Sequence, residues 1–118
     1  MNHIFKKRIP LGVIFILVFS ASALAAEEEI VKIQGVIMAL DLKKNVMIVN
    51  ERLFALNQNT TIHNDKGATI TIDKLRPKTW VYIEGLKDKM NRQIMARKIY
   101  LLPKYIEEKE KHLYPFIQ

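Results

Sequence analysis

The sequence of 118 residues contains no cysteine and only three histidines, and both scarcities exclude chemistry. Without cysteine the chain forms no disulfide, no thiolate metal site and no thiol nucleophile. His3, His63 and His112 lie far apart, which leaves little material for a histidine metal centre or a Ser-His-Asp triad. His63 beside Asp65 is the one pairing a metal could use, and a histidine in a surface turn is the simpler interpretation. We predict no catalytic residue, no metal site and no cofactor.

A hydrophobic run long enough to cross a bilayer is also missing. The apolar stretch Leu11–Phe19 has nine residues, whereas a spanning helix needs about 20. It follows the cations Lys6–Arg8 and precedes the small-residue pattern Ala23-Leu24-Ala25, the order expected of a secretory signal peptide. The sequence therefore predicts a signal peptide over residues 1–25, cut after Ala25, and a periplasmic or secreted protein with no stable transmembrane segment after cleavage. The alternative is an uncleaved anchor over Ile9–Ala26, which also places residues 27 onward outside the cytoplasm.

The excess of positive charge is small once the leader is set aside. The whole chain carries 19 Lys plus Arg against 12 Asp plus Glu, and removing Lys6, Lys7 and Arg8 leaves a net charge of +4. This value is ordinary for a small domain and does not require a polyanionic partner. The remaining length is enough for one domain with a modest core.

Short runs of β-branched and aromatic residues alternate with clusters of turn residues, a pattern typical of all-β domains. The predicted strands cover residues 30–42, 46–49, 52–56, 60–62, 69–72, 80–85 and 93–102. The apolar phase changes at Gly35, which predicts a β-bulge there, and a second bulge is predicted near Arg97 and Lys98. A single helical turn capped by Asp73 is expected before Pro77, and a short amphipathic helix is expected over residues 104–114.

Several segments occur in an order that resembles a known family. They are Gly35-Val36-Ile37-Met38-Ala39-Leu40-Asp41, Asn59-Thr60-Thr61-Ile62, Asp73-Lys74-Leu75-Arg76-Pro77, Val81-Tyr82-Ile83-Glu84-Gly85 and Met95-Ala96-Arg97-Lys98-Ile99. The chain is similar to small secreted bacterial β-barrels, OB-fold-like domains of unknown function. The resemblance implies an OB-like antiparallel barrel of five to six strands over residues 29–102, with residues 103–118 as an amphipathic C-terminal tail or helix. It brings no catalytic residues, and Lys78 stands where the family usually has a glycine, so the turn type there is open.

The OB architecture directs attention to one strand, because such barrels bind ligands on exposed strand faces and neighbouring loops. Trp80 and Tyr82 share one side of their strand by two-residue spacing. The cations around them in sequence are Arg76, Lys78, Lys87, Lys89, Arg92, Arg97 and Lys98. The predicted ligand-binding residues are Trp80, Tyr82, Lys78, Arg76, Arg97 and Lys98. The competing interpretation is that the two rings pack under the C-terminal helix while the lysines solvate loops.

These observations favour an exported, non-catalytic binding module. Its expected partner is an anionic envelope polymer or another protein, and export argues against nucleic acid. The alternative is a structural or assembly accessory of a cell-envelope complex, recognised through a sheet edge or the C-terminal helix. The oligomeric state is left open by the sequence.

Overall fold

The computed structural model describes residues 28–118, and this part of the chain is mostly β-sheet. The strands are β1 (Glu28–Asp41), β2 (Val46–Val49), β3 (Arg52–Ala55), β4 (Thr61–His63), β5 (Thr69–Ile70), β6 (Trp80–Asp88) and β7 (Ile94–Leu102). Two 3-10 helices are present, η1 (Ile72–Lys74) and η2 (Glu108–Leu113). The predicted signal peptide and its cut after Ala25 lie outside the described residues. Within residues 28–118 there is no helix of the length and apolarity needed to cross a membrane.

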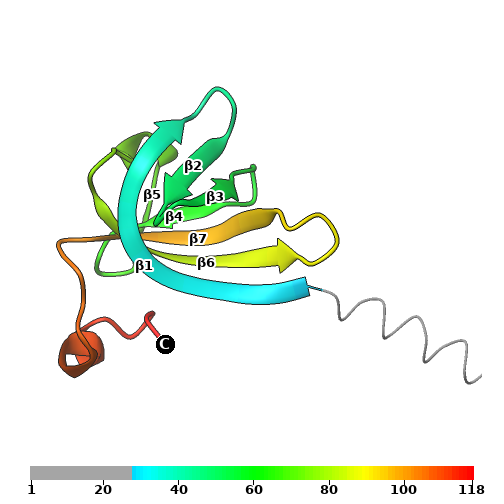
Figure 1. Cartoon of the computed structure of the whole chain (residues 1–118). Helices are drawn as coiled ribbons and strands as arrows, with labels where there is room; N and C mark the ends of the chain where they lie inside the picture. Colours follow the sequence, from blue (N-terminus) through cyan, green and yellow to red (C-terminus); the bar gives the residue numbers. More distant parts are fainter. Residues whose placement is uncertain (1–27) are drawn as a thin grey trace, which may run out of the picture.

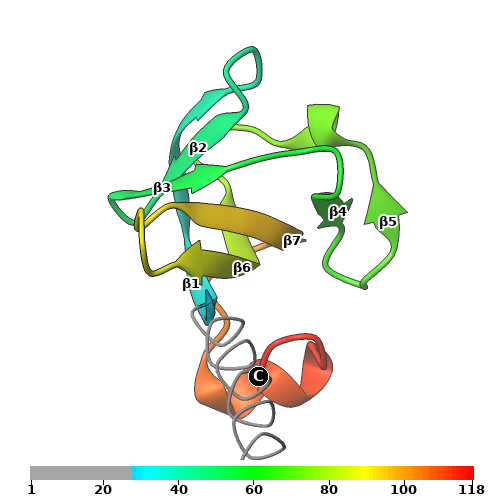
Figure 2. The same ribbon diagram turned by 90° about the vertical axis from the view of Figure 1, so that its right-hand side faces the viewer.

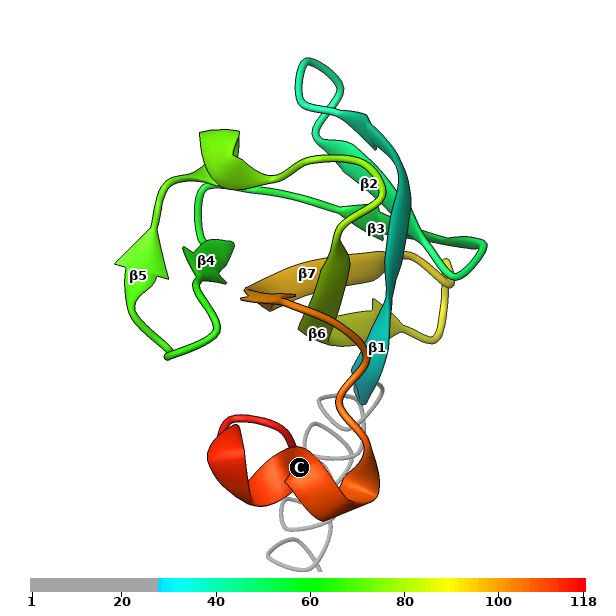
Figure 3. The ribbon, with the colours of Figure 1, turned by 90° about the vertical axis from the view of Figure 1, so that its left-hand side faces the viewer.

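The strands form one sheet in the order β3-β2-β1-β6-β7-β4-β5, which confirms the expected all-β fold. A further parallel pairing joins β3 to β7, so β1, β2, β3, β7 and β6 are linked in a ring (Figure 1). The short β4–β5 hairpin attaches to β7 through parallel pairing of β4. Figures 2 and 3 show the C-terminal segment lying beyond one side of this ring, next to β1 and β6.

In β1, the alternation of inward and outward residues is interrupted after Gly35 and not at Gly35. Val31, Gly35 and Ile37 all face inward, so the phase does not change at Gly35. The register with β2 shifts instead between Ile37 and Ala39, and Met38 is left 63% exposed. The position predicted for the bulge, Gly35, is therefore wrong, and the bulge lies a few residues later in β1. Its position depends on where β2 pairs with β1, which the sequence does not show.

Gly35 is required for a different reason, which is the close approach of Asn50. A Cβ atom at Gly35 would lie 2.5 Å from the Asn50 Oδ1 atom. Asn50 Nδ2 donates a hydrogen bond of 2.9 Å to the Gln34 carbonyl oxygen. Asn50 and Glu51 both have positive φ angles, 51° and 63°, as a two-residue hairpin turn between twisted strands requires. The turn between β2 and β3 thus rests directly on β1.

The bulge predicted in the last strand is confirmed. Glu84 pairs with Lys98 and Gly85 pairs with Ala96, which leaves Arg97 as the additional residue on β7. The bulge keeps the apolar side chains before and after it on the inner face. The buried inner residues of β7 are Ile94, Ala96 and Ile99, as expected, with Leu101 packed partly against them.

The buried side chains form two clusters on opposite faces of β6 and β7. The larger cluster fills the ring and includes Ile37, Met47, Phe54, Ile83 and Ile99, each fully buried. The smaller cluster consists of Tyr82, Tyr100, Leu102, Ile106 and Ile117. It brings the C-terminal segment onto the outer face of the sheet, where the predicted ligand-binding rings also lie.

Two predicted helical segments differ in extent from the observed ones. The turn expected to be capped by Asp73 is η1, which begins at Ile72; Thr71 occupies its N-cap position without a side-chain capping hydrogen bond, and Asp73 lies within the turn. The amphipathic helix expected over residues 104–114 is only the six-residue η2, because its apolar residues do not recur along one continuous stripe.

Candidate binding site

The predicted aromatic pair lies under the C-terminal segment, residues 103–118, which we call the tail. Tyr82 is only 2% exposed and packs in one cluster with Ile106 and Ile117 of the tail. Trp80 is half-buried and meets Tyr105 edge-on, with ring centroids 5.7 Å apart. The prediction that Tyr82 presents its ring to a ligand is therefore wrong for the folded chain. The tail brings its own apolar side chains to this face, as the competing interpretation of the sequence expected.

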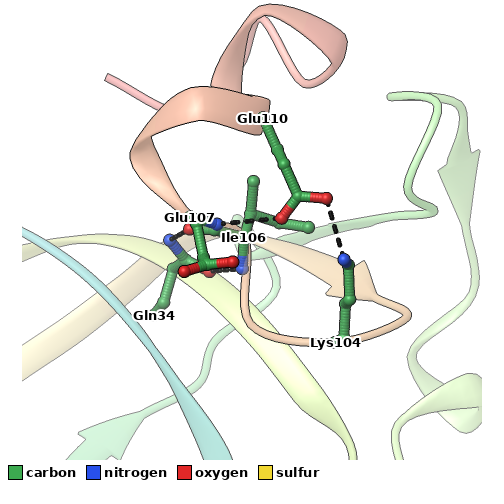
Figure 4. A network of polar contacts seen from close by, with 5 residues as sticks. All are labelled: Gln34, Lys104, Ile106, Glu107 and Glu110. Atoms are coloured by element: carbon green, nitrogen blue, oxygen red, sulfur yellow. Dashed lines mark hydrogen bonds and ion pairs between the residues drawn. The ribbon is translucent and has the colours of Figure 1, made fainter.

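The tail is attached to β1 through both polar atoms of one side-chain amide (Figure 4). Gln34 Nε2 donates to the Ile106 carbonyl oxygen at 3.0 Å, and the Ile106 amide donates to Gln34 Oε1 at 2.8 Å. Glu107 and Glu110 form a reciprocal capping box at the start of η2, and Lys104 pairs with Glu110 at 2.8 Å. Ile106 itself is fully buried. The tail thus has a defined position in the fold.

Tyr100 is the centre of a stack of three rings on the same outer face. Phe116 lies parallel to Tyr100, with centroids 4.0 Å apart and an angle of 3° between the planes. His63 stacks on Tyr100 at 4.6 Å. Two rings stacked on a third must lie on its opposite faces, so Tyr100 is enclosed between β4 and the tail. The stack joins the β4–β5 hairpin to the C-terminal segment.

The phenol groups beneath the tail stay protonated over a wide pH range. Burial raises the pKa of Tyr82, although the nearby Gln118 main chain acts in the opposite direction. Burial likewise raises the pKa of Tyr100, and the charge of Glu84 adds to the effect. Among residues 28–118, the Tyr82 hydroxyl has no partner in hydrogen-bond geometry. Both rings therefore serve packing in the folded chain and offer no charge to a ligand.

The predicted cations do not gather around the aromatic pair. Arg76 and Lys78 precede the first residue of β6, whereas Lys87 is near its end. Nine residues of strand extend over roughly 26 Å, so the two groups lie at opposite ends of the sheet. Arg97 and Lys98 lie between them and line a shallow hollow of about 220 Å³ with Ile30 and Leu86. The single basic and aromatic face expected from the sequence is therefore not formed.

Arg76 and Lys78 lie in the turn that leads into β6. The guanidinium of Arg76 donates to the carbonyl oxygens of Asp73 and Leu75. Lys78 has a φ angle of 68°, in the left-handed region that glycine adopts most easily. Its amide donates to the Ile37 carbonyl oxygen at 2.7 Å, which holds the turn against β1. The turn therefore keeps a glycine-like conformation although lysine occupies the position.

A separate group of cations surrounds a groove at the other end of the ring. We call it the cationic groove. It measures about 570 Å³ and is lined by Arg52, Leu53, Lys87, Asn91, Arg92, Gln93 and Ile94. The lining thus holds three cations, two amides and two aliphatic side chains, and it contains neither a carboxylate nor an aromatic ring. In the sequence, Lys87 and Arg92 are only two of many basic residues, and no local pattern distinguishes Arg52.

Strand alternation explains why these cations meet. Arg52 has the same phase as buried Phe54 on β3, and Lys87 has the same phase as buried Ile83 and Gly85 on β6. Both cations therefore continue the inner face of their strands beyond the apolar core. Arg92, with a φ angle of 61°, completes the group from the loop between β6 and β7. The groove is the open end of the ring.

The three cations are available to an outside partner. None of them forms an ion pair with another residue in the described range 28–118, where the ion pairs found are both within the tail. By register, Glu29 of β1 lies directly opposite Lys87. With opposite charges directly across a sheet worth roughly 0.2–1 kcal/mol, Glu29 offsets only part of this charge.

Metal binding has little support in the described residues. His63 is stacked on Tyr100, and its ring nitrogens lie 2.9 Å from Thr61 Oγ1 and 3.3 Å from the Gly67 carbonyl oxygen. No group of three or more His, Asp or Glu side chains in residues 28–118 is arranged to hold a metal ion.

The sequence matches no protein-family model and no curated protein. Two solved structures are similar to this chain. The fimbrial biogenesis protein PilY2 from Pseudomonas aeruginosa superposes with a TM-score of 0.51 at 16% identity, over 72% of this chain and 93% of PilY2. Apo-CusF from Escherichia coli, residues 6–88, gives a TM-score of 0.46 at 10% identity, over 65% of this chain and 92% of CusF. At 16% identity the likeness to PilY2 concerns the fold alone.

Proposed function

We propose that this protein is an exported, non-catalytic binding module that holds an anionic partner in the cationic groove. The observation that carries the proposal is the convergence of Arg52, Lys87 and Arg92 on one open groove whose lining includes no carboxylate. Export rests on the leader, in which cations, an apolar run and small residues follow one another.

An OB-like barrel is the architecture that best accounts for this position of the groove. The ring of pairings β1-β2-β3-β7-β6 supports closure into a five-stranded barrel. The groove is formed by the third strand of that ring and the loop between its fourth and fifth strands. OB folds commonly bind ligands at this third strand and this loop.

The groove favours an acidic partner without stacking rings. Binding of single-stranded nucleic acid uses aromatic platforms for the bases. In residues 28–118, Trp80, Tyr82 and Tyr100 instead lie with the tail on the outer face of β6 and β7, and Phe54 is buried in the larger cluster. Carboxylate or phosphate groups on an envelope polymer or on a protein match the three cations and two amides of the groove.

The proposal is tested by the binding of a simple polyanion. Linear poly-glutamate, labelled with a fluorophore, is titrated with the purified protein at low and at physiological salt, and anisotropy is measured. Replacing Arg52, Lys87 and Arg92 together by Ala is expected to weaken binding by at least about tenfold, because three close charges are lost.

The matched control replaces Lys43, Lys44 and Lys66, three exposed loop lysines, by Ala. It removes the same net charge and is expected to change binding by less than about twofold, since the loops lie away from the groove. Equal loss in both triple variants would mean that only net charge matters, and the groove would then have no role.

A second candidate function is an assembly accessory in a cell-envelope complex. It is supported by the fold shared with a fimbrial biogenesis protein and by the tail, which presents Leu113 at 63% exposure. Cross-linking in envelope extracts tests it. A Leu113→Glu variant should lose a specific cross-linked protein if the tail is the contact, while the groove variant keeps it.

A further inference from the structure

Among residues 28–118, the first half of β1 has a neighbouring strand on one side only. Its pairing with β6 runs from Glu28 to Val36, whereas its pairing with β2 begins at Ile37. Figure 1 shows this half of β1 extending past β2 along β6. The Gln34 carbonyl oxygen is taken by Asn50, so residues 28–33 form an edge with no partner strand in the described chain. We call this segment the free edge.

The side chains of the free edge are divided between the two faces of the sheet. Lys32 and Gln34 contact the tail, through Gln118 and Ile106, so they point to the tail side. Alternation places Glu28 and Ile30 on this side as well, and Val31 on the opposite, inner side. Ile30 is 67% exposed, whereas Val31 is 8% exposed. On the tail side, the free edge thus presents an acidic, an apolar and a basic residue in order, namely Glu28, Ile30 and Lys32.

The charges on this side are incompletely balanced within one chain. Glu28 lies directly opposite Asp88 of β6, and like charges in that position destabilise a sheet. Lys32 lies opposite Glu84. Glu28 and Lys32 are four residues apart on one strand, roughly 13 Å, which is too far for a direct pair. A basic group arriving on the open side of Glu28 would relieve the crowding of negative charge.

We propose that the free edge pairs antiparallel with the free edge of a second copy of this chain. Ile30 then lies opposite Ile30 of the second copy on a two-fold axis. Glu28 lies opposite Lys32 of the second copy, and Lys32 lies opposite Glu28, so the two ion pairs are equivalent by symmetry. In this register the inner faces of both sheets lie on the same side, as a continuous sheet demands.

A second copy fits the free edge better than an unrelated strand because the edge is its own complement. On the tail side, reversing the sequence Glu28 to Lys32 places Glu28 against Lys32 and the exposed Ile30 against itself, while Glu29 meets Val31 on the inner side. An unpaired edge with an exposed apolar residue is also a common site of strand addition. Five paired residues bury less than a standard interface of about 1,600 Å², so the dimer is expected to be weak and to form at high protein concentration.

Sedimentation velocity over a concentration series, at low ionic strength, tests the pairing. The purified protein should show reversible self-association. Glu28→Lys and Lys32→Glu should each weaken it on the order of tenfold, because each replaces two attractive pairs by two repulsive ones. An equimolar mixture of the two variants should associate as well as the original chain, since every cross-strand pair in the mixed dimer is again opposite in charge.

Lys66→Glu, on an exposed loop, is the matched control and should leave self-association unchanged. Fluorescence of Trp80, the only tryptophan, verifies that each variant is folded. The proposal is overturned if the protein stays monomeric up to about 1 mM, a concentration that corresponds to only about 4 kcal/mol of binding. It is equally overturned if the mixture associates no better than the separate variants, which would indicate another interface.

Discussion

Truncation of Ile106 to Ala should release the tail while the ring of strands stays folded. Ile106 is fully buried in the smaller cluster, against Tyr82 and Leu102 and below η2. Its backbone carries both hydrogen bonds to Gln34, so it joins the polar and the apolar attachment of the tail. No residue of the larger cluster lies in the tail, and the perturbation is therefore local.

The expected magnitude follows from the burial and the hydrogen bonds. Isoleucine to alanine at a fully buried position costs about 2–5 kcal/mol. Each of the two Gln34 hydrogen bonds contributes about 0.5–1.5 kcal/mol net, and they remain possible in the variant. The loss from Ile106 thus equals or exceeds what these bonds supply. Although Phe116 and Ile117 still pack on the sheet, the population of the undocked tail should rise by about 30-fold or more.

Two measurements separate release of the tail from global unfolding. Limited trypsin digestion reports cleavage at Lys109 and Lys111, and urea denaturation followed by the far-UV circular dichroism of the strands reports the ring. In Ile106→Ala, cleavage should accelerate by at least about tenfold at urea concentrations where the ring is still folded. Leu113→Ala is the control, because Leu113 is 63% exposed and its truncation should change stability by less than about 0.5 kcal/mol. Unchanged cleavage in Ile106→Ala would refute the packing described for the tail.

Three further substitutions probe single features of the fold. Lys78→Gly should raise the free energy of unfolding in urea by about 0.5–1 kcal/mol, since a positive φ angle is easier for glycine; a decrease would contradict the turn geometry. Gly35→Ala should lower it by about 1–3 kcal/mol, because the new methyl group displaces the Asn50 side chain and its hydrogen bond, and less in an Asn50→Gly background. Tyr82 has a pKa raised by burial above its usual value of 10.0, so its contribution to stability is complete below pH 10 and is lost as the pH rises toward the folded-state value. Tyr82→Phe should therefore reduce the alkaline loss of thermal stability without lowering stability at pH 7, and an unchanged alkaline profile would count against burial as its cause.

The strands could be predicted because their signals are local. Alternation of apolar residues located β2, β3, β6 and β7 to within a few residues, and the interruption of that alternation near Arg97 located a real bulge. The bulge in β1 was misplaced because its position depends on where β2 joins, which is a long-range contact. Gly35 stands out in the sequence, but its role is to admit the Asn50 side chain from the following hairpin.

The candidate sites were less predictable for the same reason. Alternation placed Trp80 and Tyr82 correctly on one side of β6, yet it could not show what covers that side. Arg52 joins Lys87 and Arg92 only because β3 and β7 pair at Phe54 and Ile94.

The amino-acid sequence by itself determined the class of fold and the inner faces of β6 and β7, because period-two alternation and turn residues act over a few positions. Only the tertiary structure decided which surfaces are open. Packing of the tail closed the aromatic face of β6 and β7, closure of β3 onto β7 gathered three cations, and the shortness of β2 left half of β1 without a neighbour. Each of these depends on contacts between residues far apart in the chain, which local patterns do not encode.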